Sequence, residues 1–575
     1  MERFINILIV NGNDKIQKGL KQILVGGGNN VLLSDSIENA YEIVKNKEIG
    51  IIIVSVDDSK NALHEWYELR RKSKLKNNYI LIITSEISAK LKLVKGLTYG
   101  AVDYISFPFN PNLVKSKVEV YKSLYYKDQR IGQLLNNIFP SSVINDLAGN
   151  GKFSAKQIQN GVVIFTDFVD FSAKAKKINP LQLIKKLENY FTKFDEIIEK
   201  YNIEKIKTIG DSYMAIAGVT ESYPKPTLRA CLAAMEIRNF MRNERDVAIA
   251  MKKDFWEIRI GIHMGPLVAG IIGTSKYSFD VWGDTVNIAA RAEAASVGGK
   301  ITITSNIQPA IENYFETKSR GQIDIHKRGG NIEMFYLGQL KTKYCMYGEG
   351  VSPNSKIREI CGLETVDFQR MRTEIINRLK SLLPDNISYH DVHHTIDVEK
   401  SVIRYSKLEG ITNHEILLLR TAALFHDAGY ILKYSKNEDF AIQMANKSLP
   451  KFGFIQKDIE IITSIINATK HHIEPINNLQ KIMCDADHDY LGRPDYYMIA
   501  NKLREELNNL GKTFKESEWL NFQINFLKNE HIYYTETARN IRELGKTARI
   551  EELEQKLKEI EWKFTQEKVT TVLHS

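Results

Sequence analysis

Short apolar segments alternate with amphipathic stretches over the first 120 residues. The segments at 6–10, 51–56, 80–84 and 102–106 have the length and apolar character of buried strands. Regular alternation of strands with helical stretches is typical of a doubly wound parallel sheet. We therefore predict an α/β domain over residues 1–125.

The pattern then becomes helical over residues 112–147. Apolar residues recur there at spacings of four, three and four, which is typical of a short coiled-coil stripe; they are Val114, Val118, Tyr121 and Tyr125. Pro140 and the glycines of 149–151 interrupt the pattern. We predict a helical linker over residues 126–155.

Three further segments follow. Residues 156–340 mix strand-like and helix-like patterns, which favours an α+β domain, and the irregular residues 341–365 read as a linker. Residues 366–548 are mostly helical, which predicts an all-α domain. Apolar residues at alternating spacings of three and four predict a helical tail over 549–575; they are Ile550, Leu553, Leu557, Ile560 and Phe564.

Composition narrows the class of protein. Hydrophobic residues make up 43% and charged residues 26% of the 575 residues, which is ordinary for a multidomain globular chain. The net charge of +9 comes without blocks of like charge, so we expect no nucleic-acid binding. Four scattered cysteines indicate reduced thiols, and no apolar run approaches the ~18 residues of a membrane span. We expect a cytoplasmic protein.

The first domain resembles a response-regulator receiver. The resemblance lies in the apolar segment 6–10, in Thr84 at the end of a strand, and in GAVDYISFPF at 100–109. It implies an acidic pair where residues 11–13 read Asn-Gly-Asn, a phosphoryl acceptor at Ser55 and a lysine at Phe107.

None of those positions has the required side chain, and Asp57 and Asp58 are displaced beyond the acceptor position. Without these groups, neither Mg²⁺ binding nor phosphoryl transfer is supported. We predict a pseudo-receiver that dimerises, senses another signal or docks an upstream signalling protein.

Two aspartates stand at the ends of apolar strands in the middle segment, Asp167 in VVIFTDFVDFS and Asp211 in KTIGDSYMAIAG. A single aspartate at a strand end is usually a turn residue, but a pair of carboxylates suits Mg²⁺. The motif TSKYSFDVWGDTVNIAARAEAA at 274–295 adds Asn287 and Arg291, which share a face if this segment is helical.

These motifs resemble the catalytic domain of class III nucleotidyl cyclases over about residues 160–340, and residues 131–147 resemble the signalling helix that often precedes it. The resemblance implies a ferredoxin-like α+β fold that acts as a homodimer, with active sites at the interface. It implies that Asp167, Asp211 and the Phe168 carbonyl hold two Mg²⁺ or Mn²⁺ ions. The remaining site residues that it implies are Asn287, Arg291, Arg259, Phe171, Ser172 and either Lys327 or Arg328.

By the same resemblance, Lys207 and Asp280 select the base. Lysine only donates and ionised aspartate only accepts hydrogen bonds, which complements N1 and the N6 amine of adenine. We therefore expect ATP as substrate and cyclic AMP as product. Asp170 departs from the glycine that is common at its position.

Eight of the chain's 13 histidines lie within residues 390–488. The adjacent His426 and Asp427 in an apolar stretch favour a transition metal, because a buried charge needs a partner. Residues 385–495 resemble the HD-type metal-dependent phosphohydrolases.

That resemblance implies one or two Mn, Fe or Zn ions. It places His394, His426, Asp427 and Asp487 in the first site, with Asp485 as a rival to Asp487. It places His390 on the same helix face as His394 as a proton donor, and gives His471 and His472 to a second metal.

The main interpretation is an adenylate cyclase flanked by a pseudo-receiver and an HD-type domain. One alternative is a bifunctional enzyme that also hydrolyses a cyclic nucleotide. The other is a non-catalytic scaffold that senses nucleotide.

Overall fold

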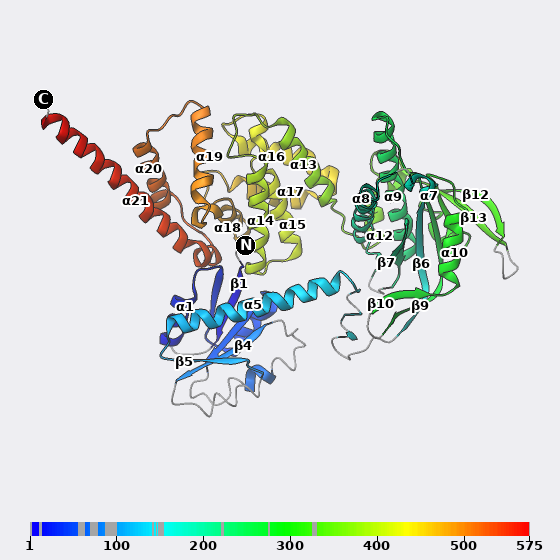
Figure 1. The fold of residues 1–575 in the computed structure, drawn as a ribbon, viewed down its shortest axis with the longest axis horizontal. Helices are drawn as coiled ribbons and strands as arrows, with labels where there is room; N and C mark the ends of the chain where they lie inside the picture. The colour runs from blue at the N-terminus through cyan, green and yellow to red at the C-terminus, as the bar shows by residue number, and fades with distance from the viewer. Residues whose placement is uncertain are drawn as a thin grey trace. The chain divides into compact units, whose positions relative to one another are not determined.

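The computed structural model (Figure 1) divides the chain into two compact units. Unit 1 joins Met1–Ile131 with Asp367–Ser575, and unit 2 is Gly132–Val366. The described residues are 3–10, 14–55, 64–68, 79–86, 100–140, 143–144, 146–147, 155–176, 178–219, 223–273, 277–324 and 331–573.

The N-terminal part of unit 1 is a five-stranded parallel sheet in the order β2-β1-β3-β4-β5. This is the doubly wound arrangement that the alternating pattern predicts. Its elements are β1 (Ile5–Val10), α1 (Asp14–Leu24), β2 (Asn29–Ser34), α2 (Ile37–Asn46), β3 (Ile51–Ser55), β4 (Ile80–Glu86), β5 (Asp103–Phe107) and α5 (Pro111–Asn136). Strand β2 was not predicted, because it opens with two asparagines that are buried in the fold.

Helix α5 corrects the coiled-coil prediction. Val114, Val118 and Tyr125 are buried in the core of the parallel sheet, with Tyr121 packed against it. The predicted stripe is therefore the face that α5 packs against its own domain. The helix also runs without a break through the predicted boundary at residues 125 and 126.

The C-terminal part of unit 1 is helical. Its elements are α13 (Phe368–Leu382), α14 (Val392–Glu409), α15 (Asn413–Phe425), η4 (Ala428–Ile431), α16 (Asn437–Ser448), η5 (Leu449–Phe452), α17 (Gln456–Asn467), α18 (Asn478–Asp487), η6 (Asp489–Gly492), α19 (Tyr496–Asn509), α20 (Glu516–Asn525), η7 (Phe526–Glu530) and α21 (Glu536–Leu573). The predicted boundary at 548 falls inside α21, so residues 549–573 continue that helix and are no separate element. Among the described helices, none is long and apolar enough to cross a membrane.

The two parts of unit 1 meet through buried asparagines. Asn540 on α21 donates to Asn30 on β2 (2.8 Å), and Asn30 donates to Asn6 on β1 (2.8 Å). Asn6 in turn donates to the backbone carbonyl of Leu408 on α14 (3.1 Å). Buried amides that satisfy one another in this way fix the register of the two parts.

Unit 2 is built on an eight-stranded sheet in the order β12-β13-β11-β9-β6-β8-β7, with β10 paired to β9. Its elements are β6 (Lys156–Phe168), α7 (Phe171–Ala175), α8 (Pro180–Lys200), β7 (Glu204–Ile209), β8 (Ser212–Ala217), α9 (Pro226–Ala250), β9 (Ile258–Ile272), β10 (Ser278–Trp282), α10 (Asp284–Ala294), β11 (Ile301–Thr304), α11 (Gln308–Ile311), β12 (Phe315–Asp324) and β13 (Asn331–Leu340). The succession β6-α8-β7-β8-α9-β9, with the spatial order β9-β6-β8-β7 and antiparallel pairing, is the ferredoxin-like arrangement. Helices α8 and α9 cover one face of the sheet, and α10 packs on the other (Figure 1).

The predicted linker at 341–365 is part of unit 2. It forms the short helices η2 (Thr342–Tyr344), η3 (Met346–Gly348) and α12 (Ser355–Ile360). Cys345, Ile357 and Cys361 are buried in the same core as the central sheet. The prediction of a linker is wrong here because glycine-rich composition does not show burial.

Candidate functional site

The carboxylates of unit 2 lie at the ends of adjacent strands. Asp167 is the penultimate residue of β6, and Asp211 lies in the turn between β7 and β8. Gly210 has φ 64°, the left-handed conformation that this tight turn requires and that glycine adopts without strain. Pairing of β6 with β8 brings the two carboxylates together.

The carboxylates of Asp167 and Asp211 repel each other when both are ionised. Burial and the neighbouring Asp167 raise the pKa of Asp211 to about 6. The backbone N–H of Phe168 donates to Asp167 Oδ1 (3.0 Å). Two neighbouring carboxylates, one of which is protonated more readily because of the other, fit a divalent cation such as Mg²⁺, which would take the place of the proton on Asp211.

Arg259 and Glu293 complete this cluster. Arg259 faces Asp167 across the strand pair β6–β9 and donates to its Oδ2 (2.9 Å). Arg259 Nε lies 3.0 Å from Glu293 Oε1, and burial raises the pKa of Glu293 to about 7 although Arg259 opposes the shift. A Cβ at Gly261 would lie 2.0 Å from the Glu293 nitrogen, so the glycine allows α10 to pack this closely. The sequence interpretation missed Glu293, whose only sequence signal is its place inside the 274–295 motif.

Asn287 and Arg291 lie on another face of α10. At 100° per residue, Asn287 is about 120° and Arg291 about 160° around the helix from Glu293. Asn287 is exposed and Arg291 half-buried. Helix α10 therefore turns Glu293 to the carboxylates of its own sheet and turns Asn287 and Arg291 away from them.

Lys207 and Asp280 lie together, as the base-selecting hypothesis requires. Lys207 on β7 and Asp280 on β10 form an ion pair with Nζ 2.5 Å from Oδ2. Asp280 Oδ1 accepts a hydrogen bond from the backbone of Val281 (2.9 Å), which orients the carboxylate. Both side chains remain partly exposed.

The structure describes only some of the residues that the cyclase resemblance assigns to substrate binding. Asp170 adopts φ 56° immediately before α7, which begins at Phe171 and includes Ser172. Asp170 and Ser172 are exposed. Lys327 and Arg328 lie outside the described residues.

In the helical part of unit 1, buried histidines and aspartates converge on one point. Ligand atoms of His394, His426 and Asp487 lie within 4.8 Å of one another. Asp427 Oδ2 is 3.3 Å from His394 Nε2 and 3.0 Å from His426 Nε2. These two nitrogens and Asp427 Oδ2 are buried without hydrogen-bond partners of good geometry. His426 Nδ1 lies 2.8 Å from the Ala423 carbonyl, which favours the tautomer with a free Nε2.

Electrostatics in this cluster also fit a cation. Burial alone would lower the pKa of His394, but Asp427 and Asp487 outweigh it and raise the pKa to about 9. The same two carboxylates hold the pKa of His426 well above its ordinary value. A metal ion would satisfy the orphaned atoms in place of these protons.

His390 is placed differently from the prediction. Asp391 caps α14 by accepting from the His394 N–H (2.9 Å), so His390 precedes the helix and shares no helix face with His394. Its ring centroid is 5.8 Å from that of His394. The buried Glu506 lies 2.6 Å from His390 Nδ1 and orients the ring, a partner that the sequence interpretation missed.

The other predicted metal ligands of this part, Asp485, His471 and His472, do not join the cluster around His394 and His426. Asp485 accepts from the Tyr534 and Thr535 N–H groups (2.7 and 2.8 Å), so it anchors the loop before α21 and is no rival to Asp487. His471 is exposed beside Glu530, and its ring stacks on His472 at 4.5 Å. Neither joins the metal-ligand group that the described residues form.

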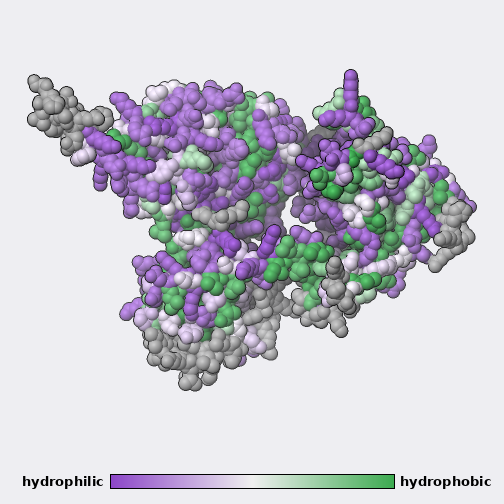
Figure 2. All heavy atoms as spheres, viewed as in Figure 1, coloured by the Kyte–Doolittle hydropathy of each residue, from purple (hydrophilic) through white to green (hydrophobic). Residues whose placement is uncertain are grey.

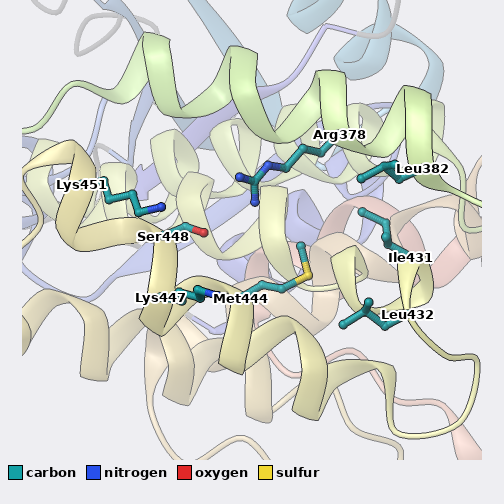
Figure 3. A pocket seen from close by; sticks show the side chains of 8 residues that line it. All are labelled: Arg378, Leu382, Ile431, Leu432, Met444, Lys447, Ser448 and Lys451. Carbon is teal, nitrogen blue, oxygen red and sulfur yellow. The ribbon is translucent and has the colours of Figure 1, made fainter.

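A groove of about 370 Å³ elsewhere on the helical part carries no such chemistry. In Figure 3, two lysines lie at one end and three apolar side chains at the other, with Arg378 and Met444 between them. The lining residues are Arg378, Leu382, Ile431, Leu432, Met444, Lys447, Ser448 and Lys451. Among these described residues there is no histidine, cysteine or carboxylate that would bind a metal.

In the parallel sheet, Ser55 and Thr84 are register partners on β3 and β4. Both side chains are buried. Phe107 ends β5, so an aromatic ring stands where the receiver resemblance implies a lysine. Residues 11–13, 57 and 58 lie outside the described part of the chain, and the receiver resemblance stays a prediction.

Several relatives share the middle of the chain. It is 30% identical over 207 residues to an adenylate cyclase of Mycobacterium tuberculosis, covering 36% of this chain and 46% of the relative. It is 34% identical over 225 residues to the germination-specific adenylate cyclase of Dictyostelium discoideum, and that match covers 38% of this chain and 25% of the relative. It is 29% identical over 210 residues to the beta-2 subunit of soluble guanylate cyclase of Rattus norvegicus, and that match covers 36% of this chain and 30% of the relative. The chain thus spans less than half the length of these relatives.

One solved structure to which part of this chain is similar is the adenylyl cyclase CyaB from P. aeruginosa. It is 24% identical, the match covers 32% of this chain and 96% of that chain, and the TM-score is 0.31. The family "Adenylate and Guanylate cyclase catalytic domain" matches residues 153–339, which contain both strand-end aspartates and α10. Residues 153–339 of this chain are therefore a class III adenylate/guanylate cyclase catalytic domain.

Proposed function

We propose that the protein is a cytoplasmic adenylate cyclase that converts ATP to 3′,5′-cyclic AMP and pyrophosphate. The observation that carries this proposal is the Lys207–Asp280 pair, which stands in the same folded unit as the Asp167–Asp211 carboxylates. The relatives include adenylate and guanylate cyclases, so the choice of base rests on these two side chains.

Asp167 and Asp211 would hold two Mg²⁺ or Mn²⁺ ions. Such ions, when bound, acidify the ribose 3′-hydroxyl and neutralise the triphosphate. Arg259, held through Nε by Glu293, keeps its other end beside Asp167, where it can contact a phosphate. Phe171 and Ser172 follow on α7 beside this site.

Lys207 and Asp280 would exchange their mutual ion pair for the edge of adenine. Lysine donates to N1, and aspartate accepts from the N6 amine. Guanine presents a donor and an acceptor in the opposite order. A mismatched polar group costs about 1–3 kcal/mol, so we expect GTP to be disfavoured by roughly 10- to 100-fold or more.

The active site would be shared by two copies of the chain. Asn287 and Arg291 face away from the carboxylates of their own unit, although the cyclase resemblance places them at the ribose and the transferring phosphorus. A homodimer lets each copy supply them to its partner. Mixing Asp167→Ala chains with Asn287→Ala chains should then restore activity that each variant lacks alone; no restoration would contradict the shared site.

The decisive experiment is nucleotide turnover by the purified chain with Mn²⁺ and either ATP or GTP, with products separated over time. We expect cyclic AMP from ATP, with kcat/KM for ATP at least tenfold above that for GTP. Asp280→Ala should remove most of this preference, while Asp284→Ala on the exposed start of α10 should retain it. No cyclic product from either nucleotide, with ATP still bound, would favour the nucleotide-sensing scaffold.

A second activity is favoured by the orphaned Nε2 atoms of His394 and His426. We infer that these histidines, with Asp427 and Asp487, hold a Mn, Fe or Zn ion for hydrolysis of a phosphoester. Such an ion supplies an activated water when bound. His390, oriented by Glu506, is placed to protonate the leaving oxygen.

Metal analysis and product analysis test this second activity together. We expect at least one transition metal per chain after supplementation, and its loss in His426→Ala but not in His414→Ala. If cyclic AMP is the ester hydrolysed, product will rise and then fall to AMP in the wild type alone. Less than one metal per chain would contradict the site.

A further inference from the structure

The groove on the helical part of unit 1 has opposite chemistry at its two ends. Lys447 on α16 and Lys451 on η5 lie at one end (Figure 3). Leu382 at the end of α13, Ile431 at the end of η4 and the next residue, Leu432, lie at the other. A ligand that fills the groove therefore meets cations at one end and an apolar wall at the other.

The protein does not neutralise the charge of the basic end. Among the described residues that line the groove, none is acidic, and Lys447 and Lys451 form no ion pair with any described residue. Arg378, farther along the groove, lies 2.9 Å from Glu374 of its own helix and keeps only part of its charge for a ligand. A concave surface with charge of one sign attracts a ligand of the other sign. The basic end therefore suits an anionic head group.

The apolar end is open to water. Leu382 and Leu432 are 56% and 63% exposed, although the face of the helical part in Figure 2 is mostly hydrophilic. Met444 continues the apolar wall toward the basic end, and its flexible side chain adapts to an apolar chain. Each methylene group of a ligand that leaves water for this wall should strengthen binding about fourfold.

The volume of the groove limits the size of the ligand. A cavity of about 150 Å³ holds benzene, so by the same measure the groove, with about 370 Å³, has room for about a dozen non-hydrogen atoms. This volume is in the range of small-molecule pockets. A carboxylate with a chain of about ten carbons has this size, and its two ends match the two ends of the groove.

We propose that the groove binds a medium-chain fatty acid of about ten carbons. Its carboxylate accepts hydrogen bonds from the ammonium groups of Lys447 and Lys451. Its chain covers Leu382, Ile431 and Leu432. This binding is independent of both proposed activities, because no lining residue belongs to the cyclase site or to the metal cluster.

An occupied groove would act on the proposed metal centre through η4. Tyr430 directly precedes Ile431, and its ring stacks on the ring of His390 with 4.4 Å between centroids. The Tyr430 hydroxyl lies 3.3 Å from His390 Nε2. A ligand that holds Ile431 and Leu432 therefore restrains the ring that we propose as proton donor. This consequence rests on the proposed second activity, whereas the binding does not.

Calorimetric titration of the full chain with decanoate tests the site. We expect one decanoate per chain, bound at least tenfold more weakly by Lys447→Glu combined with Lys451→Glu. Lys433→Glu, at an exposed lysine outside the groove, should leave the affinity unchanged. Octanoate should bind roughly tenfold more weakly than decanoate, because it buries two fewer methylene groups. Equal binding of decanoate and uncharged decanamide, or unaltered binding in the double variant, would overturn the proposal.

Two further measurements separate the alternatives. Co-sedimentation with phosphatidylglycerol vesicles that the double variant abolishes, without saturable decanoate binding, would overturn the proposal in favour of a membrane surface. Decanoate should slow hydrogen exchange at η4 but not at α20, and tight binding without slower exchange at η4 would overturn the coupling to His390. Decanoate binding in a protein that binds no transition metal would contradict the proposed second activity alone.

Discussion

At the scale of single residues, the raised pKa of Asp211 sets how strongly metal binding depends on pH. The pKa of Asp211 is raised to about 6 by burial and by Asp167, so below pH 6 a divalent cation must displace a proton. We expect the Mn²⁺ concentration for half-maximal cyclase activity to rise about tenfold per pH unit below pH 6 and to level off above about pH 7. Titration of activity with Mn²⁺ from pH 5 to 8 measures this.

The raised pKa of Asp211 also affects the stability of the fold, and this effect favours low pH, whereas metal binding favours high pH. The folded, metal-free protein binds the Asp211 proton more tightly than the unfolded chain does, because 3.8 is the ordinary pKa. The stabilisation that this proton gives to the folded state is therefore present below about pH 4 and is lost as the pH rises through 6. Asp211→Asn should abolish this pH dependence in denaturant titrations. A metal requirement that stays flat between pH 5 and 7 would contradict the raised pKa of Asp211.

Asp170 pays a conformational penalty beside the proposed phosphate site. Its φ of 56° is the left-handed conformation, which costs a residue with a Cβ about 1 kcal/mol or more. Asp170→Gly should raise the free energy of unfolding by roughly that amount and, by removing a negative charge, lower the KM for ATP several-fold. Asp170→Ala separates the two effects, since it removes the charge and keeps the strain. A higher KM in Asp170→Gly would indicate that the carboxylate contacts a metal.

The sequence singled out residues whose chemistry leaves a mark in the local pattern, and the structure brings these residues together in pairs, while their roles stay predictions. Asp167 and Asp211 each end an apolar strand, and Lys207 and Asp280 lie in long motifs. Glu293 has no such mark, because an acidic residue on a helix is usually solvated. Only the close approach of α10 to β9 at Gly261 shows that it is buried beside Arg259.

At the scale of elements, the segment after β13 is part of the core of unit 2. Ile357 on α12 is fully buried in that core, so Ile357→Ala should lower the free energy of unfolding of unit 2 by about 2–5 kcal/mol. Lys356→Ala, at an exposed neighbour on the same helix, should change it by less than about 0.5 kcal/mol. Urea titration followed by tryptophan fluorescence measures both. Equal stabilities would mean that α12 is detached in solution.

Element prediction failed where composition and burial disagree. Residues 341–365 look like a linker because glycines and Pro353 break periodicity, yet short helices there bury Cys345 and Cys361. On α5, two apolar stripes overlap in the sequence, and periodicity alone does not tell which one the parallel sheet covers. The strand order and the ferredoxin-like topology follow from long-range pairing that no local pattern records.

At the scale of the whole molecule, unit 1 joins the two ends of the chain around α14. His394 lies in the first turn of this helix, and Glu409 at its end pairs with Lys47 of the parallel sheet (3.2 Å). Asp489, two residues beyond Asp487, is buried against Arg404 and Arg542, and both arginines stack on Phe4. The proposed metal centre is therefore connected to the N-terminal sheet by one helix and one buried ion cluster.

This connection predicts that metal removal loosens both parts of unit 1. With a transition metal at 100 times its dissociation constant, binding stabilises the unit by about 2.7 kcal/mol. Chelation should lower the thermal midpoint of unit 1 by several degrees and speed hydrogen exchange in α14, β1 and β2 together. The Asp167→Asn background removes the contribution of the cyclase metals, and His426→Ala should show no effect of chelator. If exchange quickens in α14 while β1 and β2 stay unchanged, the asparagine interface does not couple the two parts and the N-terminal domain folds independently.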